Sequence, residues 1–133
     1  MAAPIIPQIF IPGPRLIDGS DLNNAMANDL AGSQDTLTAT GTTRATATQL
    51  TVQINRFSTV GASGQCILPP CKAGEYVIIY NYGANTLTVI GFLSTDTIDG
   101  AASVTISAAT RGALFYCLTP GAWYSSALGA TTT

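Results

Sequence analysis

Three cysteines and one pair of carboxylates are the residues of this chain best suited to chemistry. The cysteines are Cys66, Cys71 and Cys117, and Asp96 and Asp99 lie three residues apart in the segment TDTIDG. The chain has no histidine, which is the commonest general base and metal ligand. A cysteine nucleophile needs an activating partner, and that partner is usually a histidine. We therefore expect no catalytic residue, and we expect that the chain is not an enzyme.

The two aspartates allow three interpretations. They could form a glycosidase-like acid and base pair, or they could bind a divalent cation. A general acid, however, needs a carboxyl group whose pKa is raised, usually by burial. An aspartate in a turn-rich segment more often accepts hydrogen bonds from nearby backbone N–H groups. We favour the turn role for Asp96 and Asp99, with ion binding and catalysis as the alternatives.

The cysteines also allow three interpretations. An odd number of cysteines in a reducing compartment indicates buried free thiols. The turn at residues 69–70, Pro-Pro, could instead bring Cys66 and Cys71 together as a disulfide. A zinc site needs four ligands, and three thiolates without a histidine supply only three. We favour buried thiols, leave the Cys66–Cys71 disulfide open, and expect no metal and no cofactor.

The composition indicates a surface that is partly covered in an assembly. Of the 133 residues 47% are hydrophobic but only 9% are charged, against roughly 25% in an ordinary soluble domain. Part of the surface is then covered by other subunits, or it is solvated by uncharged polar side chains such as threonine. We expect the chain to associate with copies of itself.

The charged residues do not point to nucleic acid or to a membrane. The basic residues are scattered, without the cluster that phosphate binding needs. No segment approaches the ~20 continuous apolar residues of a membrane span. The apolar beginning of the chain lacks the positive region of a signal peptide, so we expect synthesis in the cytoplasm. The five basic residues are Arg15, Arg44, Arg56, Lys72 and Arg111.

Residues 1–19 predict an extended, proline-rich arm. Four prolines within the first 14 residues exclude a regular helix and favour a polyproline II conformation. Between them lie large apolar side chains that are costly to leave in water, at ~25 cal/mol per Å². Such an arm would lie in a groove on another subunit or partner, although a disordered terminus is the alternative. The residues expected to bind the partner are Ile5, Ile6, Ile9, Phe10 and Ile11.

Residues 20–31 predict one short helix. Ser20 is a good N-cap, and Gly32 ends the helical pattern. Leu22, Met26 and Leu30 recur at helical spacing and form a narrow apolar stripe. A helix this short is not stable alone, so the stripe must dock against another part of the structure.

Residues 36–126 predict the main β domain, followed by a flexible tail at 127–133. Alternating apolar residues predict strands at 48–57, 65–68, 75–81, 86–92, 103–107 and 113–119, and a last strand from 123. Residues 75–92 are expected to form a hairpin, and 36–48 an edge strand or a linker. We see no repeat at a solenoid period. The expected fold is therefore mainly β, as an antiparallel β-sandwich, barrel or jelly-roll-like domain.

The aromatic residues of the β domain allow two roles. Tyr76 and Tyr80 share one side of a predicted strand, and Trp123 or Tyr124 could join them. Exposed aromatic side chains on one face could bind a host-surface glycan. Packing in the core or at a subunit interface is the role that we favour.

The order of motifs resembles a group of small structural proteins of tailed bacteriophages. The shared segments are RLIDGSDLNNAMANDL, TATGTTRATATQLTVQINRF, LPPCKAGEYVIIYNYGANTLTVIG, DTIDGAASVTISAATRGALFYC and PGAWYS. The resemblance covers about residues 15–126 and consists of turn and strand patterns, with no catalytic signature. It implies an oligomeric virion component with a β domain, and a homotrimer by analogy with capsid decoration and head-fibre proteins.

The expected function is that of a capsid decoration, or cement, protein on the outside of the phage head. The arm would bind the major capsid protein or another virion protein, and the β domains would join about a threefold axis. Many such weak contacts would strengthen the shell through avidity. The alternative is a tail fibre or tip, or a receptor- or carbohydrate-binding β module.

Overall fold

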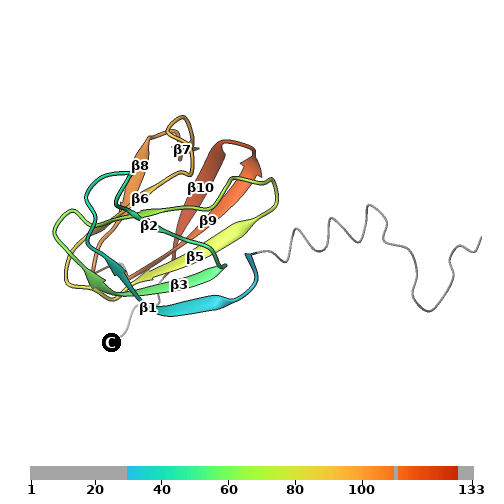
Figure 1. Ribbon diagram of the computed structural model, residues 1–133. Coiled ribbons are helices and arrows are strands. Elements are labelled where there is room, and N and C mark those ends of the chain that lie inside the picture. Colours follow the sequence, from blue (N-terminus) through green and yellow to red (C-terminus); the bar gives the residue numbers. More distant parts are fainter. Residues whose placement is uncertain (1–29, 110, 129–133) are drawn as a thin grey trace, which may run out of the picture.

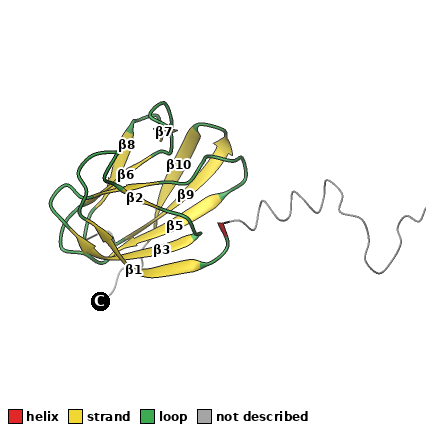
Figure 2. Ribbon diagram, viewed as in Figure 1, coloured by secondary structure: helices red, strands yellow, loops and turns green. Residues whose placement is uncertain are grey.

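The computed structural model describes residues 30–109 and 111–128, and strands dominate this part of the chain (Figures 1 and 2). Neither range contains an α-helix, and so neither has a helix that could cross a membrane. The strands are β1 (Ser33–Ala39), β2 (Thr48–Gln49), β3 (Ile54–Val60), β4 (Gln65–Ile67), β5 (Tyr76–Asn81), β6 (Leu87–Ile90), β7 (Thr97–Ile98), β8 (Ser103–Ile106), β9 (Gly112–Thr119) and β10 (Ala122–Leu128).

Successive strands from β1 to β9 alternate between two sheets, and this winding makes a β-solenoid. The six-stranded sheet has the order β1-β3-β5-β9-β10-β7, and the four-stranded sheet has the order β2-β4-β6-β8. β1, β3 and β5 pair in parallel in the first sheet, as do β2, β4 and β6 in the second. The chain therefore coils three times through both layers, which face one another in Figure 1.

The last strands end the parallel winding with antiparallel pairs. β8 runs antiparallel to β6, and β9 runs antiparallel to β5. β9 and β10 form a hairpin around a Pro-Gly turn at residues 120–121. β7 then pairs in parallel with β10 and forms one edge of the six-stranded sheet, while β1 forms the other.

The prediction of a mainly β chain is confirmed, but the prediction of an antiparallel sandwich, barrel or jelly roll is wrong. Period-two alternation identifies the buried side of a strand but not the direction of its neighbour. The expected hairpin at 75–92 is a clear example, because β5 and β6 belong to different sheets. The expected strand at 48–57 is interrupted for the same reason: β2 ends at Gln49, and the chain changes sheet before β3 begins at Ile54.

A solenoid is present although the sequence has no visible repeat. Phe57 pairs with Leu37 in the preceding coil and with Asn81 in the following coil. The three stacked positions thus hold an aromatic, an aliphatic and an amide side chain. The backbone geometry repeats while the side chains do not, so the predicted absence of a solenoid repeat missed the architecture.

The N-terminal predictions lie largely outside the described residues. This applies to the extended arm at 1–19 and to all but the last two residues of the expected helix at 20–31. Before the sheet, Leu30 alone of the described residues is helical, as a single 3-10 position (Figure 2), and the strand β1 begins three residues later. Leu30 is itself buried and belongs to the core cluster. Of the expected tail at 127–133, residues 127–128 belong to β10 and the others lie outside the described residues.

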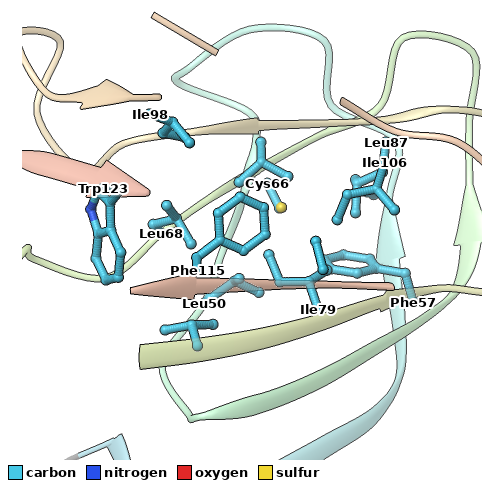
Figure 3. Packing of buried hydrophobic residues seen from close by; sticks show 14 of the residues in the cluster. Leu50, Phe57, Cys66, Leu68, Ile79, Leu87, Ile98, Ile106, Phe115 and Trp123 are labelled. Carbon is cyan, nitrogen blue, oxygen red and sulfur yellow. The ribbon is translucent and has the colours of Figure 1, made fainter. Parts of the chain in front are cut away.

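The core fills the space between the two sheets. Phe57, Ile79 and Phe115 point inward from the six-stranded sheet, toward side chains of the four-stranded sheet (Figure 3). Cys66, Leu87 and Ile106 come from that second sheet, and all six residues are at most 2% exposed. Burial of each large apolar side chain stabilises the fold by about 1.5–3 kcal/mol.

Two asparagine side chains, the buried Asn81 and the exposed Asn85, satisfy backbone groups where the coil turns. Asn81 donates from Nδ2 to the carbonyl oxygens of Asn85 (2.9 Å) and Ile106 (2.8 Å). Its Oδ1 accepts the N–H of Gly83 at 2.9 Å. Asn85 in turn donates to the carbonyl oxygen of Val60 at 2.8 Å and so links two successive coils. These bonds matter because an unpaired buried backbone group is costly.

Candidate interaction surface

The outward side of the six-stranded sheet carries a row of tyrosines. Tyr116 of β9 lies opposite Tyr76 of β5 on one side and opposite Tyr124 of β10 on the other. The rings of Tyr116 and Tyr124 are stacked, with centroids 6.0 Å apart and planes inclined at 27°. Aliphatic side chains at alternate positions of the same strands extend this surface. We define the tyrosine face as Tyr76, Ile78, Leu114, Tyr116, Leu118 and Tyr124.

This face is apolar and open to solvent. Leu118 is 61% exposed, Tyr76 is 44% exposed and Tyr124 is 38% exposed. Their neighbours along the strands point the other way and are buried, as strand alternation requires; Val77, Phe115 and Trp123 are all 0% exposed. None of the six residues of the tyrosine face is charged. A contiguous exposed apolar surface of this kind is typical of a contact site.

A second aromatic cluster lies at the other end of β5. Tyr82 is 49% exposed and sits between two guanidinium groups, with Arg56 5.2 Å and Arg111 4.9 Å from its ring centroid. Tyr80 meets its ring edge-on at a centroid distance of 6.3 Å. Such cation–π contacts order exposed side chains and add a positive rim to the sheet.

Arg56 also pairs with Asp35 of the edge strand β1. Its Nε donates to Oδ1 of Asp35, and both side chains are exposed. The hydrogen bond from Arg56 lowers the pKa of Asp35 from its ordinary 3.8, and the backbone N–H of Thr36 acts in the same direction. Because the pair is exposed, it orients the Arg56 side chain while contributing little to stability.

The aromatic residues singled out from the sequence separate into two groups. Tyr76 and Tyr124 belong to the exposed row, and Tyr80 lies half-buried on the same side of the sheet. Trp123 is 0% exposed and packs in the core, so the idea that it contacts a ligand is wrong. Its neighbour Tyr124 points outward because successive residues of a strand face opposite sides.

Tyr116 and Leu118 were not singled out from the sequence. Their signal was available, because they alternate along the strand predicted at 113–119 with Phe115 and Cys117, which are both buried. The sequence did not show which strands lie next to one another in the sheet. Only the pairing of β5, β9 and β10 brings Tyr116 between the two other tyrosines.

The aspartate pair has structural contacts. Asp96 is 6% exposed, and its Oδ2 accepts the N–H of Leu93 at 2.9 Å. This is the predicted turn role. Asp99 instead reaches the last strand, where its Oδ1 accepts the N–H of Ser125 at 2.9 Å and its Oδ2 accepts the Ser125 hydroxyl. Within the described residues no group of three or more Asp, Glu or Cys side chains is placed to hold a metal ion.

The cysteine predictions need correction. Cys71 and Cys117 form a disulfide, with Cα atoms 5.9 Å apart. The open alternative, a bond between Cys66 and Cys71, is therefore wrong, because Cys66 is a buried free thiol. Burial raises the pKa of the Cys66 thiol far above its ordinary range. The expectation of buried free thiols is correct for Cys66 and wrong for the other two cysteines. Cys71 and Cys117 are 46 residues apart in sequence, and only the fold brings them together.

A shallow pocket of about 440 Å³ lies beside the disulfide, where three loops meet. Phe92 and Leu93 are 41% and 55% exposed at its rim. Arg44 donates to the carbonyl oxygens of Gly91 (2.7 Å) and Phe92 (3.0 Å) and holds this loop in place. The pocket is lined by Pro70, Cys71, Phe92, Leu93, Thr95, Asp96, Pro120 and Gly121.

The residues predicted to bind a partner or to dock are mostly outside the described part. This applies to Ile5, Ile6, Ile9, Phe10 and Ile11 of the arm, and to Leu22 and Met26 of the helix. Leu30 is described and is 6% exposed within the core. Comparison of the chain with protein-family models, with curated proteins and with solved structures finds no match.

Proposed function

We propose that the chain is a non-enzymatic structural protein that acts by binding other proteins and copies of itself. The observation that carries this proposal is the uncharged tyrosine face, exposed in a chain with only 9% charged residues. An exposed apolar sheet face is costly in a free monomer and useful in an assembly. The aspartates support the proposal as well, because their carboxylate oxygens bond to backbone and hydroxyl groups of the fold.

The motifs shared with tailed-bacteriophage proteins favour one kind of assembly. We propose a capsid decoration protein that is made in the host cytoplasm and lies on the outside of the phage head. Its arm binds the major capsid protein or another virion protein through Ile5, Ile6, Ile9, Phe10 and Ile11. Neighbouring copies then meet through their tyrosine faces about a threefold axis, and the many contacts act together.

Capsid binding by an arm deletion tests this proposal. Capsids that lack the protein are mixed with the wild-type chain or with a variant lacking residues 2–14, and the bound fraction is measured by cosedimentation. The deletion leaves every described strand in place, so the variant should fold and fail to bind. A deletion that binds as well as the wild-type chain would show that the arm is not the anchor.

The tyrosine row favours a second candidate, a tail-fibre or receptor-binding module that contacts a host-surface glycan. Exposed Tyr76 and Tyr124 flanking Tyr116 would supply aromatic rings for stacking against sugars. A glycan array probed with the wild-type chain distinguishes the two candidates. Binding that is lost in Tyr76→Ser and Tyr124→Ser would favour the receptor module, and an array without signal would favour packing.

A further inference from the structure

The chain enters its first strand at the same end of the sheet as the tyrosine row. β1 begins at Ser33, which pairs with Ile54, and Ile54 pairs with Ile78 of β5. Tyr76 lies two residues before Ile78, at the end where β1, β3 and β5 all begin. The segment before Leu30 therefore joins the sheet at the end where Tyr76 lies, two strands away from it.

The lengths of chain and sheet match. Four strand spacings separate β1 from β10, about 19 Å at ~4.8 Å per spacing. Residues 15–29 connect residues 1–14 to the described part, and 15 residues span about 22 Å even at the 1.5 Å rise per residue of a helix. A tether that can reach its binding site raises the local concentration of the arm at that site. Contact within one chain is therefore favoured over contact between two chains.

The chemistry of the arm matches the face. Residues 1–14 carry no charged side chain, and the tyrosine face carries none either. Pro4 and Pro7 form a P-x-x-P spacing, which places both rings on one side of a polyproline II helix with three residues per turn. Surfaces lined with aromatic side chains bind such segments, because proline rings stack on them and the bound conformation is already favoured.

We propose that residues 4–14 fold back onto the tyrosine face of their own chain, with Pro4 and Pro7 against Tyr76, Tyr116 and Tyr124. In the free protein the two most apolar surfaces then cover one another. The contact goes beyond the proposed function and rests on it in one respect. A virion partner that binds the arm removes it from the tyrosine face, and a neighbouring copy can then bind that face. Self-association would then follow docking, and the free chain would stay a monomer.

Paramagnetic broadening in the full chain tests the contact. A nitroxide is attached to an Ala3→Cys variant, in which Cys71 and Cys117 are bonded and Cys66 is buried, so that only position 3 reacts. The proposal predicts loss of the amide signals of Tyr116 and Tyr124. The amide of Thr105, on the outward side of the four-stranded sheet, serves as the control that keeps its signal.

A mixed sample separates contact within one chain from contact between chains. Nitrogen-15-labelled chains without the nitroxide are combined with unlabelled chains that carry it. The proposal predicts no broadening in the mixture and no change of the first result on dilution. Broadening in the mixture would overturn the proposal in favour of arm exchange between copies, and absence of broadening in both samples would leave the face to another occupant.

Variants in the arm test the proline contact without altering the described strands. Pro4→Ser with Pro7→Ser should restore the lost signals, whereas Pro12→Ser with Pro14→Ser should not, since these two prolines lack the P-x-x-P spacing. Broadening that survives the first pair, or that both pairs abolish, would contradict the proposed mode. None of these results affects the capsid-binding test, so the two proposals can fail separately.

Discussion

Replacing Cys71 and Cys117 together by alanine removes the covalent link between β9 and the loop that follows β4. The disulfide closes a loop of 46 residues. The chain-entropy relation for a loop of this length gives about 4 kcal/mol of stabilisation through the unfolded state. That is a large share of the 5–15 kcal/mol typical of a domain. For a domain of about 100 residues it corresponds to a fall in Tm of roughly 15–30 °C.

Guanidinium unfolding followed by tryptophan fluorescence measures the effect. The chain has one tryptophan, Trp123, which is buried and opposite Cys117 in the sheet, so its emission reports loss of the core. A reducing agent should lower the midpoint of the wild-type chain and leave the double variant unchanged, which shows that the reductant acts through this bond. A loss of stability below about 1 kcal/mol would contradict the stabilisation expected from closure of this loop.

Three further predictions follow from single features. The raised pKa of the Cys66 thiol means that the unfolded chain, with an ordinary value near 9.0, loses this proton first. The stabilisation contributed by this thiol is therefore complete below about pH 9 and falls above it. Cys66→Ala should flatten the fall of stability with rising pH, measured by urea unfolding under alkaline conditions. Asn81→Leu removes three hydrogen bonds and should cost about 2–4 kcal/mol in the same assay, with exposed Ser126→Ala near zero as its control. Deletion of residues 2–14 should raise the sedimentation mass of the chain, and adding Tyr76→Ser with Tyr124→Ser should return it to that of a monomer.

Residue patterns located most strands of the fold. The predicted strands at 65–68, 75–81, 103–107 and 113–119 correspond to β4, β5, β8 and β9 within one or two residues. Each combines apolar alternation or a continuous apolar run with a turn signal at its ends, and both features depend on local sequence alone. Of the segment 36–48, expected to be an edge strand or a linker, only residues 36–39 belong to β1, which forms an edge of its sheet.

These sequence patterns could not predict which strands pair or which residues far apart in the sequence contact one another. Parallel coils need no particular residue at equivalent positions, as Leu37, Phe57 and Asn81 show. The Cys71–Cys117 bond joins residues that only the solenoid brings together. The candidate surface has the same origin, because Tyr76 and Tyr116 are 40 residues apart in sequence yet lie side by side in the sheet.

The proposed decoration function places the chain on the outside of a virion head. Antibody-gold labelling of intact particles, produced by cells that encode the chain and imaged by electron microscopy, tests this location. The proposed decoration function predicts gold over the whole head. Gold confined to the tail would support the receptor-binding candidate instead, and particles without gold would contradict the assignment to a virion.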